Sequence, residues 1–207
     1  ATDFGDLLEE SNNGGSVSDS TRGVIVTGGI PSSPGRRNHI NFVTMASAGN
    51  ATDFGDVSDG ISQAKGMNNR TRGVFHLGGI APSNGNNTLE YITIQSTGNS
   101  VDFGDLTVRR SDSGSAGSRT RAVMASGFGS GFSPNYGNVI DFVTIASQGD
   151  AQDFGDRTVK STSMSALSNE TRMVIGNGSV LSSPHANNTH DFVTIASTGN
   201  AVDFGDS

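Results

Sequence analysis

Acidic residues recur in pairs along the chain, in the four-residue phrase Asp-Phe-Gly-Asp. Its copies begin at Asp3, Asp53, Asp102, Asp153 and Asp203, so the spacings are 50, 49, 51 and 50 residues. Two carboxylates three residues apart supply oxygen ligands of the kind that Ca²⁺ takes. The Phe and Gly between them, however, indicate a strand, and no aspartate-rich loop surrounds the phrase. We therefore predict no metal site and no cofactor.

Other groups with catalytic chemistry form no recognisable pattern. The four histidines fall at different positions of the repeat, and the absence of cysteine excludes disulfides, thiolate metal sites and cysteine nucleophiles. One acid in each of the last three repeats, and an asparagine in the first, precedes an aromatic residue. These acids would serve a glycan hydrolase only if two converged on one pocket. We expect no enzyme, and a glycan hydrolase or lyase is the least favoured alternative. The residues are Asn41, Glu90, Asp141 and Asp191.

Each phrase closes a repeat in which three strands are evident. In the first repeat, residues 21–29 form a β-branched run that ends in Gly-Gly, residues 38–47 form a second strand, and residues 52–57 carry the phrase. A fourth strand is expected in stretches of small residues such as 111–118 and 161–168. Four short antiparallel strands in about 50 residues describe one propeller blade. No stretch has the apolar period of a helix, so we predict an all-β, four-bladed β-propeller.

The repeats predict a single domain over residues 1–207. Its blades cover approximately residues 7–56, 57–105, 106–156 and 157–206, and residues 1–6 form an extra outer strand. The phrase occurs five times but the middle strands occur four times. We favour a ring of four blades closed within one chain. The alternatives are two chains that form one eight-bladed ring, and a segment of a longer array.

The arrangement resembles the kelch repeat. In the first repeat the matching elements are Arg22, Gly28-Gly29, Asn41-Phe42 and Phe54, although Phe replaces the usual outer Trp and two of the Gly-Gly doublets are broken. The phrasing is also similar to repeats in structural and tail proteins of bacteriophages. That resemblance implies a virion or extracellular location and a role in host attachment.

An arginine also recurs once per repeat, and it needs a recurring partner. A carboxylate that recurs at the same period is suited to bidentate pairing with a guanidinium. We predict structural ion pairs, because internal repetition mostly reflects the fit between neighbouring blades. The alternative is a ring of arginines that binds an anion. The residues are Arg22, Arg72, Arg121 and Arg172, with Asp3, Asp53, Asp102, Asp153 and Asp203, or the second Asp of each phrase, as partners.

Charge and composition limit the kinds of molecule that the chain is expected to bind. With 20 acids against 13 bases and a net charge of -7, the chain is a poor match for nucleic acid, and it has no apolar run long enough for membrane insertion. We predict a non-enzymatic binding or structural module that contacts host-surface glycan or other virion proteins. The alternative is a self-assembling decoration unit, and a homo-oligomer fits both. The loops that vary between repeats supply the candidate ligand contacts. They are Arg36, Arg37, Phe132, Tyr136, His185 and Asn187.

Overall fold

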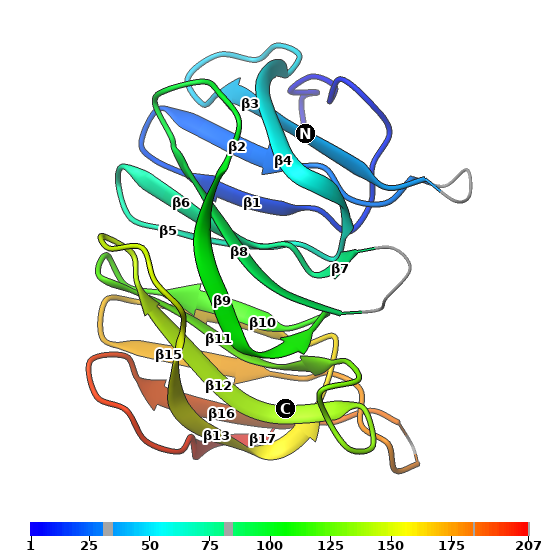
Figure 1. Ribbon diagram of the computed structural model, residues 1–207, viewed down its shortest axis with the longest axis vertical. Helices are drawn as coiled ribbons and strands as arrows, with labels where there is room; N and C mark the ends of the chain where they lie inside the picture. Colours follow the sequence, from blue (N-terminus) through cyan, green and yellow to red (C-terminus); the bar gives the residue numbers. More distant parts are fainter. Residues whose placement is uncertain (31–34, 81–84, 184, 207) are drawn as a thin grey trace.

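The computed structural model describes residues 1–30, 35–80, 85–183 and 185–206, and its ordered elements are β-strands (Figure 1). The described residues contain no helix, and so none that is long and apolar enough to cross a membrane. Every repeat forms a four-stranded antiparallel sheet, and the four sheets make a propeller-like fold. The predicted all-β class and the four blades are therefore confirmed.

We number the sheets as blades in chain order. Blade 1 contains β1 (Gly15–Ser18), β2 (Arg22–Val26), β3 (Arg37–Thr44) and β4 (Thr52–Ser62). Blade 2 contains β5 (Lys65–Asn68), β6 (Arg72–His76), β8 (Asn86–Thr93) and β9 (Val101–Arg110). Blade 3 contains β10 (Gly114–Gly117), β11 (Arg121–Phe128), β12 (Tyr136–Thr144) and β13 (Gln152–Ser161). Blade 4 contains β14 (Ser165–Ser168), β15 (Arg172–Gly176), β16 (Thr189–Thr194) and β17 (Val202–Asp206). The short β7 (Gly79–Ile80) pairs with the end of β4.

The four inner strands lie beside one another. β1 contacts β5, β5 contacts β10, and β10 contacts β14. β10 and β14 come from the stretches of small residues in which a fourth strand was expected, and small side chains suit the crowded centre where blades converge; β5, in contrast, also carries Lys65 and Met67. The outer strands carry the Asp-Phe-Gly-Asp phrase, and β4, β9 and β13 then run on to the inner strand of the next blade (Figure 1).

The phrase glycine is required by a close approach between blades. Gly55 has a φ of 144°, a conformation that side chains with a Cβ rarely adopt, and a Cβ there would lie 2.4 Å from the backbone of Gly98 in blade 2. Gly104 and Gly155 meet the next blade in the same way, at Gly149 and Gly199. The outer strand of one blade is therefore pressed against the turn between the third and fourth strands of the next blade.

The hydrophobic core consists of three layers, each between successive blades. Val24, Val26, Ile40 and Phe54 of blade 1 pack against blade 2, and equivalent clusters join blades 2 and 3 and blades 3 and 4. Among the described residues, no such cluster joins blade 4 to blade 1. In Figure 1 these two sheets lie at opposite ends of the stack. The expected closure of the ring within one chain is thus not seen, because the two end blades leave their outward faces without a shared core.

Candidate functional site

The recurring arginines stack on aromatic rings. In each blade the guanidinium lies 4.2 to 4.4 Å from the centroid of an aromatic ring on the third strand, and that ring meets the Phe of the phrase edge to face. Arg and aromatic rings attract at this distance through the quadrupole of the ring. The four groups are Arg22–Phe42–Phe54, Arg72–Tyr91–Phe103, Arg121–Phe142–Phe154 and Arg172–Phe192–Phe204.

Three of these arginines also join neighbouring blades. Nη1 of Arg22 donates to the carbonyl oxygen of Ile94 at 3.0 Å, and Arg72 and Arg121 donate in the same way to Ile145 and Ile195 at 2.9 Å. No ion pair links any recurring arginine to a phrase aspartate in the part of the chain that the structure describes. The predicted ion pairs are replaced by ring stacking and carbonyl contacts. The physical reason is strand alternation, which turns Phe54 inward and leaves Asp53 exposed.

The phrase aspartates act instead through their backbone. The carbonyl oxygen of Asp56 accepts a hydrogen bond from Ser100 N at 2.9 Å, and its N–H donates to Asn99 Oδ1 at 3.0 Å. In the two terminal copies the side chain of the first aspartate also makes a local contact: Oδ1 of Asp3 and of Asp203 accepts a hydrogen bond from the N–H two residues later at 3.1 Å. Asp102 and Asp153 are exposed on the outer strands. The described residues contain no group of three or more histidines and acids placed to hold a metal ion.

The acids that precede the aromatic residues are buried between blades. Asp141 of blade 3 pairs with Arg110 of blade 2 at 2.8 Å, and both side chains are fully enclosed. Asp141 Oδ1 also accepts a hydrogen bond from Thr107 at 2.6 Å. Asp191 repeats this arrangement one interface further on, with Arg157 at 2.8 Å and Thr158 at 2.6 Å.

The equivalent residues of the first two blades differ from this pattern. Glu90 accepts hydrogen bonds from the hydroxyls of Ser58 and Ser100. Asn41 is buried in blade 1, and its amide has no hydrogen-bond partner among the described residues. Glu90, Asp141 and Asp191 each lie in a different interface, so the structure does not bring them together in one pocket.

Arg110 and Arg157 were missed by the sequence reasoning. Neither arginine recurs at the same position in the other repeats, so a comparison of the repeats does not single them out. A signal was present, because Arg157 follows the phrase at the position held by Val57 and Leu106 in the preceding repeats. A charged residue at a position that is otherwise apolar and buried implies a buried partner of opposite charge.

The predicted loop residues mostly make contacts with nearby residues of their own blade. Arg37 pairs with Glu9 at 2.7 Å. The ring of Phe132 lies against Gly137, and Tyr136 packs edge to face on Phe128. His185 takes a φ of 63° in a turn. Asn187 accepts a hydrogen bond from Thr189 N at 2.9 Å.

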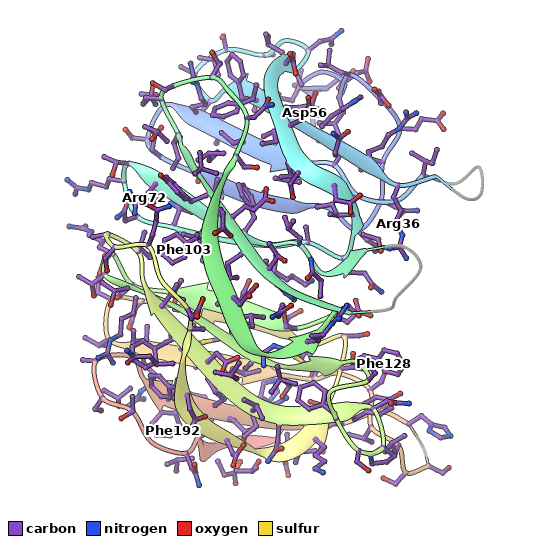
Figure 2. The ribbon with its side chains drawn as sticks, in the orientation of Figure 1. Arg36, Asp56, Arg72, Phe103, Phe128 and Phe192 are labelled. Atoms are coloured by element: carbon purple, nitrogen blue, oxygen red, sulfur yellow. The ribbon has the colours of Figure 1, made fainter. Side chains whose placement is uncertain are left out.

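Arg36 lies at the loop end of blade 1, where Figure 2 shows it on the side of the molecule opposite to Arg72. Residues 31–34, 81–84 and 184 of the variable loops lie outside the described residues. Among the described residues, no contact joins the six predicted loop residues in one site, so these residues stay separate candidates.

A different surface gathers residues from all four blades. The hairpin turns between the first and second strands meet around one hollow of about 480 Å³, which we call the hub. Each blade contributes three residues. They are Ser18, Asp19 and Ser20; Asn68, Asn69 and Arg70; Gly117, Ser118 and Arg119; and Ser168, Asn169 and Glu170.

One short motif builds each of these turns. Asn69 Oδ1 accepts hydrogen bonds from Thr71 N at 2.9 Å and from Arg72 N at 2.8 Å, so its side chain closes the turn. Asp19 and Asn169 do the same in blades 1 and 4, and Ser118 Oγ does so in blade 3. The residue between the capping side chain and the Thr is left free to vary. These variable positions are Ser20, Arg70, Arg119 and Glu170.

Hydrogen bonds across the hub fix neighbouring turns. Asn68 Nδ2 donates to Ser18 O at 2.6 Å, and Ser168 Oγ donates to Gly117 O at 2.6 Å. Arg119 pairs with Glu170 at 2.8 Å. The hub is therefore a rigid polar surface with amide, hydroxyl and charged groups.

Hydrogen bonds from neighbouring residues stabilise the ionised form of Asp19 at this surface. Slight desolvation raises the pKa of Asp19, but hydrogen bonds donated by Gln95, Thr21 and Arg22 outweigh that effect and lower the pKa to about 2. Asp19 is therefore ionised at neutral pH, and the hub carries both signs of charge.

The chain matches no protein-family model and no curated protein sequence.

Proposed function

We propose that the protein is a non-enzymatic binding module whose hub takes a polar, hydroxyl-rich ligand such as a glycan. The observation that carries this proposal is the convergence of four hairpin turns on one hollow of about 480 Å³. The scaffold is the same in every blade, whereas the outward residue differs: Ser20, Arg70, Arg119 and Glu170. A constant backbone with variable polar tips on a rigid fold is typical of a recognition surface.

The chemistry of the hub favours a sugar over an apolar ligand. Its lining residues are hydroxyl, amide, charged and glycine residues, which donate and accept hydrogen bonds. Fixed groups lose little conformational entropy on binding, and the capping side chains are already held in their turns. We place the ligand on a host-cell surface, and the protein on a virion or outside the cell, because the repeats are similar in phrasing to phage tail proteins. Other virion proteins are the alternative partner.

The test is a glycan array followed by titration calorimetry with the glycan that binds best. Arg70→Ser is the informative variant, because blade 1 carries Ser20 at the equivalent position and the turn needs only the backbone there. We expect Arg70→Ser to weaken binding about tenfold, the loss of one charge-assisted hydrogen bond. Arg36→Ser is the matched control at the opposite end of the blades. If Arg36→Ser abolishes binding and Arg70→Ser does not, the ligand binds at the loops and the hub proposal is wrong.

A further inference from the structure

Every internal interface joins the same two kinds of face. We call the face that carries the Arg–aromatic–Phe group the stacking face, and the opposite face, which bears the apolar residues of the second and third strands, the receiving face. Between blades 3 and 4, the stacking face presents Phe142 and Phe154, and the receiving face presents Met173, Ile175 and Ile195. The other two internal interfaces are built from residues at the equivalent positions.

At the two ends of the stack, one face of each kind meets no neighbouring blade among the described residues. On the stacking face of blade 4, Leu167 is 68% and Phe204 58% exposed, whereas Val17 and Phe54, at the equivalent positions of blade 1, are 4% and 2% exposed. On the receiving face of blade 1, Met45 is 52% exposed. Exposed apolar side chains on this scale are typical of an interaction surface.

Arg172 has half of the contacts that its counterparts make. It is stacked on Phe192 at 4.3 Å, as the other recurring arginines are stacked on their rings. The other three donate to a carbonyl of the following blade, but no such acceptor lies at Arg172 among the described residues. The equivalent carbonyl on blade 1 is that of Met45, at the uncovered receiving face.

The shapes of the two faces also correspond. A hollow of about 290 Å³ opens on blade 1 and is lined in part by Gly23, Ile25, Val43 and Met45. In blade 2 the glycine equivalent to Gly23 is Gly73, and Val17 of blade 1 covers it, with Val17 Cβ 3.2 Å from the place of a Cβ on Gly73. Leu167 is the counterpart of Val17 in blade 4.

The N-terminal phrase already occupies part of the receiving end. Gly49 N donates to Phe4 O at 2.7 Å, Ala51 N donates to Asp6 O at 2.8 Å, and Asp6 N donates to Asn50 Oδ1 at 3.0 Å. These are the bonds by which the phrase of each blade docks on the next blade. We call the turn that accepts a phrase its dock, which in blade 1 is residues 49–51. The copy at residues 3–6 thus fills the dock that a preceding blade would use, and the copy at residues 203–206 meets no dock among the described residues.

We propose that blade 4 of one chain stacks head to tail on blade 1 of a second copy of this chain. Leu167 then covers Gly23 of the second copy, and Arg172 donates to the carbonyl of Met45. The phrase at residues 203–206 takes the dock at residues 49–51 and displaces the N-terminal phrase. Such an interface is heterologous, because it joins two different surfaces.

Disulfide trapping tests this geometry directly, because the chain has no cysteine of its own. Leu167→Cys and Gly23→Cys are made in separate chains, mixed and oxidised mildly. We expect a cross-linked heterodimer from the mixture and none from either variant alone. The double variant Val17→Cys/Gly73→Cys is the positive control, because it places the same pair within one chain at a spacing that a disulfide spans after a small adjustment.

Two glycine variants test the competition between phrases. A Cβ on Gly5 would lie 2.4 Å from Gly49 O, so Gly5→Ala releases the N-terminal phrase, and we expect about tenfold tighter association in light scattering. Gly205→Ala has open space around it in the single chain, but the same clash arises when residues 203–206 dock. It should weaken association about tenfold, and Arg172→Met should do the same.

The results that overturn the proposal are specific. Cross-linking of Leu167→Cys to itself would mean a symmetric interface. Failure of the mixture to cross-link, even with Gly5→Ala in both chains, while the internal control does cross-link, would mean that the end faces do not meet. Val101→Asp checks surface specificity, since Val101 is exposed and apolar but lies outside both end faces. It should leave association unchanged, whereas Leu167→Asp should abolish it.

Discussion

The stacked arginines permit a matched test of what holds the blades together. Arg121 and Arg172 each lie over a phenylalanine ring, at 4.4 and 4.3 Å. Arg121 lies within the interface between blades 3 and 4, where it also donates to the carbonyl of Ile195 at 2.9 Å, whereas Arg172 is exposed on the end face of blade 4. Replacing each with Met retains apolar bulk over the ring, so the difference between the two variants reports what Arg121 contributes across the interface, chiefly the carbonyl contact.

The expected magnitudes follow from the two contacts. A hydrogen bond from a charged group contributes about 1.5–3 kcal/mol. Stacking of an arginine on a ring at a partly exposed site contributes about 0.5–1 kcal/mol. Because Arg121 is half-buried, we take the lower end of the first range. Arg121→Met should then lower the free energy of unfolding by about 2 kcal/mol, and Arg172→Met by about 0.5–1 kcal/mol.

Urea and thermal unfolding at low protein concentration measure this difference without a contribution from association. For a chain of this length, 1 kcal/mol moves Tm by about 2–4 °C, so the two variants should differ by at least about 2 °C. Asp153→Asn is the control for the ion-pair hypothesis, and a change within about 0.5 kcal/mol is expected for this exposed side chain. Equal losses for the two arginine variants would refute the carbonyl contact. A large loss for Asp153→Asn would restore the ion pair.

Three further predictions concern the interior. Burial lowers the pKa of His76 to about 4 from its usual value of 6.5. The protein should therefore have its full stability above about pH 6.5 and should lose about 3 kcal/mol as the pH falls to about 4, because the buried imidazole must then take up a proton on unfolding. Urea unfolding across that pH range should show this loss in the native chain and not in His76→Gln. Gly104→Ala should destabilise far more than Gly205→Ala in thermal unfolding, because both have φ near 140° but only Gly104 is pressed against the next blade; equal losses would assign the effect to backbone strain alone. Arg110→Met should cost about 3–5 kcal/mol by leaving Asp141 buried and unpaired, and the double variant Arg110→Met/Asp141→Asn should recover most of that loss in urea unfolding.

The parts of the fold that repeat were predictable from the sequence. The period of the phrase indicated the blades, and the stretches of small residues indicated the inner strands, because both depend on patterns within about 50 residues. The partner of the recurring arginine was not predictable in this way. Arg22 reaches Ile94, 72 residues away, and that contact depends on which turn of the next blade lies against β2. The predicted carboxylate partners are not in place, because strand alternation puts Asp53 on the exposed side.

The candidate site was only partly visible in the sequence. The loops after the second strand were expected to vary and to carry function, but the described part of those loops forms no common site. The hub arises from three-residue turns such as Asn69-Arg70-Thr71, each too short to stand out in one repeat. The sequence does mark the hub: in each turn a capping residue (Asp, Asn or Ser) and a constant Thr-Arg pair flank one residue that differs between blades. That contrast gains meaning only when the blades are known to bring the four turns together.

The count of five phrases for four blades follows from the docking of each phrase on the next blade. Four turns accept a phrase, and their bonds are filled by the copies that start at Asp3, Asp53, Asp102 and Asp153. The copy at Asp203 is the remaining one. A second chain that offers this copy must compete with a phrase tethered to the same molecule as the dock, and tethering gives the resident phrase an effective concentration of about millimolar order. The incoming chain gains the apolar end faces and the Arg172 contact in addition. The native chain should therefore associate only at a higher protein concentration, and the midpoint should move to a lower concentration in Gly5→Ala, where the resident phrase no longer competes.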